Sequence, residues 1–229
     1  INPKHKKIQG VKAYASLAQI EETVELAVIA TPAATVPDII EQCGKHQVKA
    51  AVIITAGFGE TGEAGKALER RVLETAQHYG VRLIGPNCLG VMRPEIGLNA
   101  TFNKGSANIG NLAFVSQSGA LCTAILDWAQ TNDVGFSSVV SLGSSLDIDF
   151  GEILDYLISD TRTQSILLYI EGIRDARSFM SGIRAAARIK PVILVKVGRH
   201  AVASRAAMSH TASLVGSDDA FDAAVRRAG

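Results

Sequence analysis

The chain has 229 residues, of which 47% are hydrophobic and 20% are charged, and its formal net charge is +1. This is the composition of an ordinary globular protein, and the nearly neutral charge gives no electrostatic reason to expect binding to nucleic acid or to an anionic membrane surface. No apolar run approaches the ~20 residues that span a bilayer, and no signal peptide opens the chain.

Short apolar runs alternate with helical patterns along the chain. Seven runs predict strands, at residues 26–31, 50–55, 81–85, 112–116, 136–143, 165–170 and 191–198. Helical patterns predict helices at residues 60–79, 119–131, 149–159, 175–188 and 217–227. The strand runs are continuously apolar, which is typical of parallel strands buried on both faces. The alternation predicts an α/β fold with right-handed crossovers.

The polar stretch TFNKGSANIGN at residues 101–111 lacks periodicity and separates three strands from four. We therefore expect two doubly wound, mostly parallel sheets, in a first domain at residues 1–105 and a second at residues 106–229. The first domain lacks the opening strand and Gly-rich turn with which a Rossmann-like domain begins. The chain also starts at Ile1 without methionine and stops at Gly229, so we expect it to be part of a longer protein.

Open α/β sheets bind ligands beyond the carboxyl ends of their strands, and small and polar residues recur there in this chain. In the motif VSQSGAL a strand ends, Ser116, Ser118 and Gly119 follow, and a helix begins. Backbone N–H groups at a helix start, with hydroxyl groups beside them, make a phosphate site. A plain serine N-cap of the helix is the competing interpretation.

A second loop of small residues, HTASLVGSDDAFDAA, leads into the last predicted helix. Ser217 would cap this helix, and Asp218 and Asp219 would suit its positive end. His210 lies in the loop, where an imidazole can act as a base or a nucleophile near neutral pH. Glu171 directly ends a buried strand and could orient such a histidine or stabilise its charged form. A solvated side chain is the alternative for both His210 and Glu171.

Other signatures of catalytic sites are absent from the sequence. No His, Cys or Asp cluster has the spacing of metal ligands, so we expect no metal site. There is no GxSxG nucleophile elbow and no GxxxxGK[ST] loop for the phosphates of ATP. Cys43, Cys88 and Cys122 are scattered, which favours reduced thiols and a cytoplasmic location.

Four motifs occur in the order in which NDP-forming acyl-CoA synthetases carry them: GPNCLG (85–90), SQSGAL (116–121), YIEG (169–172) and SHTASLVGSDDAFDAA (209–224). The whole chain resembles this family, which includes ADP-forming acetate–CoA ligase and, more distantly, the α subunit of succinyl-CoA synthetase. Three stretches resemble the synthetase module of bacterial proteins fused to a GNAT-type lysine acetyltransferase: GLNATF (97–102), ILDWAQ (125–130) and SLDIDFGEILDYL (145–157). The resemblance implies a truncated Rossmann-like CoA-binding domain followed by a flavodoxin-like ligase domain of the succinyl-CoA synthetase type.

The resemblance also implies a reaction, acid + CoA + ATP ⇌ acyl-CoA + ADP + phosphate. In this family phosphate attacks acyl-CoA, a histidine takes the phosphoryl group from the acyl phosphate, and a mobile loop carries it to ADP. The nucleotide and Mg²⁺ bind on an ATP-grasp domain or subunit, outside this chain. By motif match His210 is the phosphorylated residue, Glu171 steadies it, and Ser116, Ser118 and Gly119 hold phosphate.

The family's CoA-binding domain matches residues 1–100 and implies six candidate CoA contacts: Thr31, Pro32, Gly57, Phe58, Asn87 and Cys88. Lys4, Lys6 and Lys7 could meet a CoA phosphate or form a solvated basic loop. The resemblance implies a small carboxylic acid, acetate or a similar one, as the partner of CoA, and the identity of the acid and the choice between ADP and GDP stay open. Two other functions are compatible with the sequence: a non-catalytic module that senses CoA or acyl-CoA for an attached acetyltransferase, and a plain nucleotide-binding scaffold.

Overall fold

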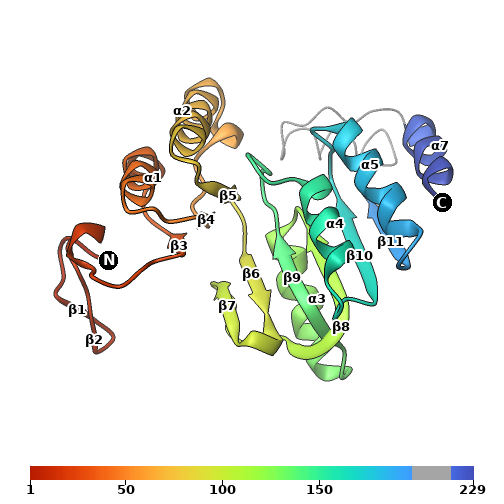
Figure 1. Cartoon of the computed structure of the whole chain (residues 1–229), viewed down its shortest axis with the longest axis horizontal. Coiled ribbons are helices and arrows are strands. Elements are labelled where there is room, and N and C mark those ends of the chain that lie inside the picture. The colour runs from red at the N-terminus through yellow and green to blue at the C-terminus, as the bar shows by residue number, and fades with distance from the viewer. Residues whose placement is uncertain (198–217) are drawn as a thin grey trace.

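The structure, a computed structural model, describes residues 1–197 and 218–229. Figure 1 shows two α/β units, the first built on a small sheet and the second on a larger one. The small sheet has three parallel strands in the order β3-β4-β5. These strands are β3 (Leu26–Ile29), β4 (Ala50–Ile53) and β5 (Arg82–Ile84).

Two helices, α1 (Val36–Lys45) and α2 (Glu63–Tyr79), connect these strands and share one apolar core with the sheet. Pro37 lies in the first turn of α1, where its missing N–H leaves no hydrogen bond unmade. α2 ends at Gly80, which has a φ of 70°, the left-handed conformation that glycine adopts most readily at a helix end. The first unit also contains a short antiparallel hairpin near the N-terminus, formed by β1 (Lys7–Ile8) and β2 (Val11–Lys12).

The larger sheet has six strands in the order β11-β10-β8-β9-β6-β7. They are β6 (Gly90–Arg93), β7 (Leu98–Thr101), β8 (Asn108–Ser116), β9 (Gly135–Ser141), β10 (Ser165–Ile170) and β11 (Val192–Lys196). The strands β8, β9, β10 and β11 are parallel, whereas β6 is antiparallel to both of its neighbours. In the centre of the sheet Leu167 of β10 lies opposite Phe114 of β8 and Ile193 of β11.

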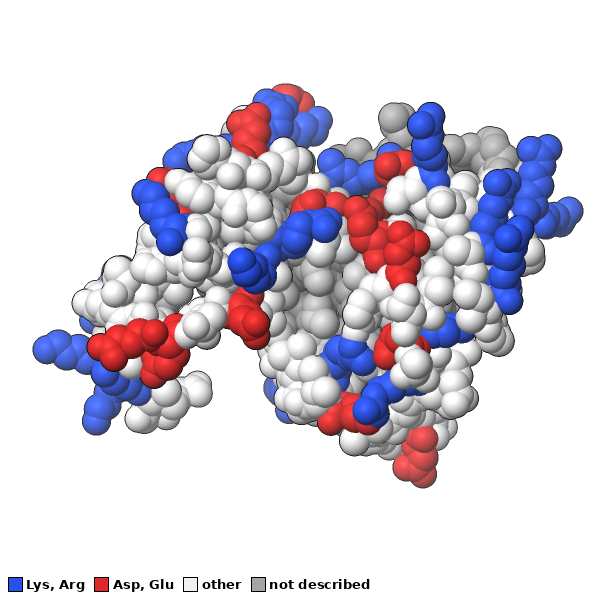
Figure 2. Space-filling model, in the orientation of Figure 1, with Lys and Arg blue, Asp and Glu red and all other residues white. Residues whose placement is uncertain are grey.

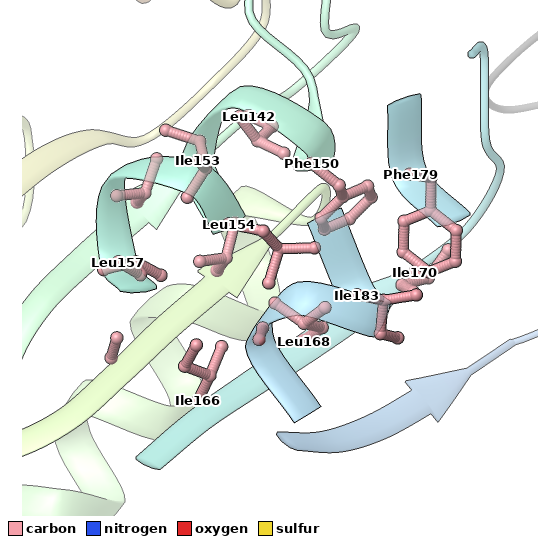
Figure 3. Packing of buried hydrophobic residues seen from close by; sticks show 14 of the residues in the cluster. Leu142, Phe150, Ile153, Leu154, Leu157, Ile166, Leu168, Ile170, Phe179 and Ile183 are labelled. Carbon is pink, nitrogen blue, oxygen red and sulfur yellow. The ribbon is translucent and has the colours of Figure 1, made fainter. Parts of the chain in front are cut away.

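Helices cover both faces of the larger sheet. α3 (Gly119–Thr131) packs on the face that carries Phe114. The other face is covered by α4 (Phe150–Ser159) and α5 (Ala176–Ala187), and α7 (Asp218–Ala228) packs against α5. Figure 3 shows this second core, where Phe150 and Phe179 meet edge to face with their ring centroids 6.1 Å apart.

The strands β8 and β10 are neighbours, yet the helices that follow them lie on opposite faces of the sheet. α3 follows β8 on one face, and α5 follows β10 on the other. Such a point, where the winding of the sheet reverses, opens a crevice at the carboxyl ends of the two strands. The fold therefore places residues 117–118 and 171–175 at the position where open α/β sheets bind ligands.

The two units are joined along the outer edge of β5 by the segment that follows β9. The N–H of Leu146 donates to the carbonyl of Gly85 at 2.9 Å, and that of Ile148 donates to the carbonyl of Leu83 at 3.2 Å. In return the N–H of Leu83 donates to Oδ2 of Asp147 at 2.8 Å. The buried side chain of Leu146 belongs to the core of the first unit, where full burial of a leucine contributes about 1.5–3 kcal/mol.

All seven predicted strands and all five predicted helices have counterparts among the described residues, which confirms the α/β fold with two mostly parallel sheets. Apart from short 3-10 turns, five elements among the described residues were not predicted: the hairpin strands β1 and β2, the helix α1, and the strands β6 and β7. β6 and β7 have four residues each, and glycine, arginine, asparagine and threonine interrupt their apolar residues, so they lack the continuous apolar run of a central strand. The chain already enters the larger sheet at Gly90, and the predicted break at 101–111 runs from the end of β7 into the start of β8.

Charged side chains of both signs are interspersed over the face shown in Figure 2, and basic side chains gather at the end formed by α5 and α7. The exposed arginines of α5 are Arg177, Arg184 and Arg188 at its end, and Arg226 and Arg227 lie in the last turn of α7. None of the helices in the described part of the chain has the length and the apolar character that a membrane span requires.

Candidate functional site

The carboxyl ends of strands from both units face one cavity of about 730 Å³. The first unit contributes the loop after β4 and the start of α2, and the second contributes the loops after β8, β9 and β10. The connection between the two units also lines the cavity. Five of the residues predicted from the sequence come together here: Asn87, Cys88, Ser118, Gly119 and Glu171.

The start of α3 opens onto this cavity. Ser118 is the N-cap, and its Oγ accepts a hydrogen bond from the N–H of Leu121 at 3.3 Å. Ser116 is fully buried beneath the turn, where its Oγ donates to the carbonyl of Ser118 and accepts from the N–H of Ser118, both at 3.0 Å. No acidic residue occupies the first turn, so the positive end of the helix dipole is available to an anion. The N-cap interpretation is confirmed, and the phosphate site stays a prediction at a serine that also lines the cavity.

Glu171 lies on the opposite side of the switch point, directly after β10, and its side chain is half-buried. The loop that carries it is held by Gln117, whose side-chain amide contacts the backbone of Glu171 and Gly172. Gln117 also lines the cavity. The prediction from the motif SQSGAL names its serines and its glycine and omits this glutamine. The sequence could have indicated Gln117 through its position between Ser116 and Ser118, two residues of the predicted phosphate-binding loop.

The connection between the units supplies Asn87 and Cys88 in the motif GPNCLG. Asn87 is exposed and adopts a φ of 56°, a left-handed conformation that asparagine tolerates well. Cys88 is 3% exposed and its Sγ donates to the carbonyl of Ile53 at 3.3 Å. Burial raises the pKa of the Cys88 thiol to about 12, so the thiol stays protonated at neutral pH and is a poor nucleophile.

Glycines let this connection approach the larger sheet closely. Gly143, which lines the cavity, has a φ of 55°, and a Cβ on it would lie 2.2 Å from the carbonyl oxygen of Pro86. The N–H of Ser144 in turn donates to that same carbonyl at 2.9 Å. The connection and the loop after β9 are thus fixed to one another at the wall of the cavity.

The other predicted CoA contacts do not line the cavity. Thr31 and Pro32 are exposed after β3, where the carbonyl of Thr31 accepts from Oγ1 of Thr55 at 2.7 Å. Gly57, with a φ of 105°, donates its N–H to Glu60 Oε1 at 2.6 Å. Phe58 is 0% exposed and packs in the core of the first unit, so its side chain serves the fold and offers no surface to a ligand.

Lys4, Lys6 and Lys7 are exposed near the N-terminus, and Lys7 belongs to β1. His210 and Ser217 lie outside the described residues, and so does the rest of the segment 198–217. The helix predicted to follow them is present as α7, which begins at Asp218.

Five charged or aromatic residues that were not predicted also line the cavity: Glu60, Lys66, Glu69, Phe102 and Arg174. Arg174 follows Glu171 in the loop after β10, and its Nη1 donates to the carbonyl of Ser145 at 2.8 Å. The sequence could have indicated Arg174 through its position in the stretch EGIRD, which directly follows a predicted strand. The described residues contain no group of three or more His, Cys, Asp or Glu side chains that could hold a metal ion.

The two units correspond to two known protein families. Residues 109–229, more than half of the chain, match the model of the succinyl-CoA ligase like flavodoxin domain, so the chain belongs to this family. Residues 1–94 match the model of a CoA binding domain.

The chain is 47% identical over its whole length to ADP-forming acetate–CoA ligase I of Archaeoglobus fulgidus and covers 33% of that protein. It is 45% identical over its whole length to subunit alpha of ADP-forming acetate–CoA ligase II of Pyrococcus furiosus and covers 50% of it. A solved structure of the dinucleotide forming acetyl-coenzyme A synthetase 1 of Ca. Korarchaeum cryptofilum, in complex with phosphate and ADP, matches the whole chain with a TM-score of 0.93 at 38% identity. The chain covers 49% of that structure and thus spans between a third and a half of these proteins. The resemblance to acetyltransferase fusions stays a prediction.

Proposed function

We propose that this chain is the CoA-binding and phosphoryl-transfer part of an ADP-forming acyl-CoA ligase, which catalyses acid + CoA + ATP ⇌ acyl-CoA + ADP + phosphate. The observation that supports this function most directly is the shared cavity. Loops of the CoA-binding unit, the N-terminus of α3 and Glu171 all line it. A reaction between an acyl-CoA and phosphate needs both reactants held in contact, and a cavity between two binding units provides that.

The CoA side of the cavity consists of the loop after β4 and the connection that carries Asn87 and Cys88. Asn87 offers an exposed amide there, and the protonated thiol of Cys88 does not compete with the thiol of CoA. CoA is a long molecule, so Thr31, Pro32 and Gly57 at the ends of β3 and β4 are candidates for contacts with its distal part. Lys4, Lys6 and Lys7 are candidates for its phosphates.

The phosphate side of the cavity is the start of α3. The backbone N–H groups of this turn and the hydroxyl of Ser118 would hold inorganic phosphate, and the helix dipole would favour its negative charge by about 0.3–2 kcal/mol. A phosphate oxygen attacks the thioester carbonyl carbon, the C–S bond breaks, and the CoA thiolate leaves and takes up a proton. The products of this step are an acyl phosphate and free CoA.

A histidine then receives the phosphoryl group. A ring nitrogen of His210 attacks the phosphorus of the acyl phosphate, the P–O bond to the acyl oxygen breaks, and the carboxylate leaves. Glu171, half-buried at the cavity wall, would accept a hydrogen bond from the other ring nitrogen and stabilise the charged ring. ADP then takes the phosphoryl group and leaves as ATP, which restores the free histidine.

The nucleotide and its Mg²⁺ would bind on an ATP-grasp domain or subunit outside this chain. We propose acetate or a similar small carboxylic acid as the acid and ADP as the nucleotide. The names of the similar proteins, which are ADP-forming acetate–CoA ligases, support both choices.

The test is phosphorylation of the intact enzyme, with its ATP-grasp part, by ATP that carries a labelled γ-phosphate. We expect acid-labile label on this chain, complete loss of it in His210→Ala, and discharge of it by acetate and CoA together. The control is His78→Ala, because His78 is an exposed histidine in the last turn of α2 and is not part of the cavity wall. Label retained in His210→Ala would overturn the assignment of the carrier. Binding of CoA without any labelling would instead support the non-catalytic sensing module.

A further inference from the structure

The strands β8 and β10 stop pairing at the edge of the cavity. Their last register pair is Ser116 opposite Tyr169, and the last backbone hydrogen bond runs from the N–H of Gln117 to the carbonyl of Tyr169 at 3.3 Å. Beyond this point the segments that follow β8 and β10 separate, because α3 and α5 lie on opposite faces of the sheet. Among the described residues, the register between β8 and β10 ends before residues 171–172.

The side chain of Gln117 hydrogen-bonds to the backbone of residues 171–172. Its Oε1 accepts the N–H of Glu171 at 2.7 Å and the N–H of Gly172 at 3.0 Å. Its Nε2 donates to the carbonyl of Gly172 at 2.9 Å. The two N–H donors and the carbonyl acceptor fix which end of the amide is oxygen and which is nitrogen, since the reversed amide would oppose all three partners.

We propose that Gln117 is the positioning residue that holds Glu171 across the switch point from the N-terminus of α3, an inference that rests on the function proposed for Glu171. Gln117 lies between Ser116 and Ser118, which shape the start of α3. One tripeptide therefore sets both the anion-binding helix start and the carboxylate opposite it. A shift of the Glu171 backbone would change the distance between these two groups, and a misplacement of ~1 Å can cost a reaction about 100-fold in rate.

The first readout is structural and does not depend on turnover. In the intact enzyme, Gln117→Leu has a similar volume and removes all three hydrogen bonds. We expect hydrogen–deuterium exchange in the peptide 169–173 to become about tenfold faster at the amides of Glu171 and Gly172, because each of these two amides loses one hydrogen bond. Gln117→Glu keeps an acceptor for both N–H groups in the same shape, so we expect it to retain most of the protection and to serve if Gln117→Leu does not fold.

The second readout is kinetic. We expect Gln117→Leu to lower kcat about 10- to 100-fold while the KM for CoA changes less than about twofold, because the change acts on the phosphoryl-transfer side of the cavity. If Gln117 acts through Glu171, its effect must vanish when the carboxylate is absent. In a Glu171→Gln background we therefore expect Gln117→Leu to lower kcat by no more than about twofold.

Gln164→Leu is the matched control. Gln164 is an exposed glutamine just before β10, and its Oε1 accepts from Nδ2 of Asn111 at 2.8 Å, so it bridges the same two strands at their other end. We expect it to change neither the exchange at 169–173 nor kcat. Unchanged exchange in Gln117→Leu, or losses that multiply in the double variant, would overturn the proposal. If the wild-type enzyme shows no phosphohistidine at all, the proposed function fails, and the exchange experiment alone decides whether Gln117 holds the Glu171 loop.

Discussion

Ser118 is the residue at which local structure and the proposed chemistry meet. Its Oγ caps α3 by accepting from the N–H of Leu121, and the residue also lines the cavity. A serine hydroxyl can accept from the backbone and donate to a ligand at the same time. Ser116 is fully buried and does not line the cavity, and its Oγ contacts the N–H and the carbonyl of Ser118.

We predict that Ser118→Ala destabilises the chain by about 1 kcal/mol through loss of the cap. We also predict a rise of about fivefold in the KM for phosphate, because about one hydrogen bond to the anion is lost. Urea unfolding measures the first effect and initial rates at varied phosphate measure the second. The control is Asp175→Ala, which removes another N-cap, since Asp175 accepts from the N–H groups of Arg177 and Ser178 at 2.9 Å. An equal rise in the KM for phosphate in both variants would show that Ser118 acts only through helix stability.

Among the elements, the segment after β9 has the strongest effect on how the two units are joined. Asp147 accepts the N–H of Leu83 and also pairs with Arg82, whose Nε lies 2.9 Å from Oδ2. The pairing raises the pKa of the Arg82 guanidinium, chiefly through the hydrogen bond to Asp147. Because Arg82 is 51% exposed, solvent screens the ion pair, and the buried N–H bond matters more.

We predict that Asp147→Ala costs about 1–3 kcal/mol of unfolding free energy, because the N–H of Leu83 loses its partner. Asp147→Asn should cost less than about 1 kcal/mol, since an amide oxygen still accepts that N–H and only the screened ion pair is lost. The control is Asp38→Ala, which breaks the exposed ion pair of Asp38 with Arg71 at 2.8 Å and leaves no backbone group unpaired. Denaturant unfolding measures the unfolding free energies of all three variants. A loss in Asp147→Ala no larger than that in Asp38→Ala would contradict the assigned role.

Gly143 offers a second test at this scale. We predict that Gly143→Ala costs about 2–5 kcal/mol, from a left-handed φ of 55° and from a Cβ placed 2.2 Å from the carbonyl oxygen of Pro86. Gly97→Ala is the matched control, because Gly97 also has a positive φ, of 68°, but its Cβ would meet nothing within 4 Å. It should cost only the ~1–2 kcal/mol of the conformation itself. If urea unfolding shows equal losses of stability in the two variants, the close contact with Pro86 does not explain why position 143 requires glycine.

The central elements were predictable from the sequence because each buried strand carries its own signal. β10 occupies residues 165–170 and α3 occupies residues 119–131, as their apolar runs and periodicity predict. The antiparallel strands β6 and β7 carry no such run, and β6 joins the sheet by pairing with β9, which lies far along the chain. Gln117 was missed for the same reason. Its role comes from residues more than 50 positions away, and no local pattern shows them.

At the scale of the whole molecule, the cavity lies where loops at the carboxyl ends of two sheets come together. The connection 85–90 joins them covalently, and the segment 144–148 joins them by hydrogen bonds along β5. Buried thiols lie in each part of this assembly: Cys43 beside the first core, Cys88 in the connection and Cys122 on the buried face of α3. The titration of these three thiols therefore reports on the packing of both units.

Burial raises the pKa of the Cys88 and Cys122 thiols to about 12 and that of Cys43 to about 11, above the ordinary value of 9.0. Below pH ~8.5 both the folded and the unfolded state keep these protons, and above it only the unfolded state releases them. The unfolding free energy should therefore fall as the pH rises from about 9 towards 12, by up to about 1.4 kcal/mol per pH unit for each thiol. Urea unfolding of the wild type and of the triple variant Cys43→Ala, Cys88→Ala, Cys122→Ala at pH values between 7 and 10.5 measures this slope. The cavities left by the alanines lower the unfolding free energy of the variant by the same amount at every pH, so they do not change its slope with pH. Equal slopes in the wild type and the variant would therefore mean that the thiols are solvated in the folded state.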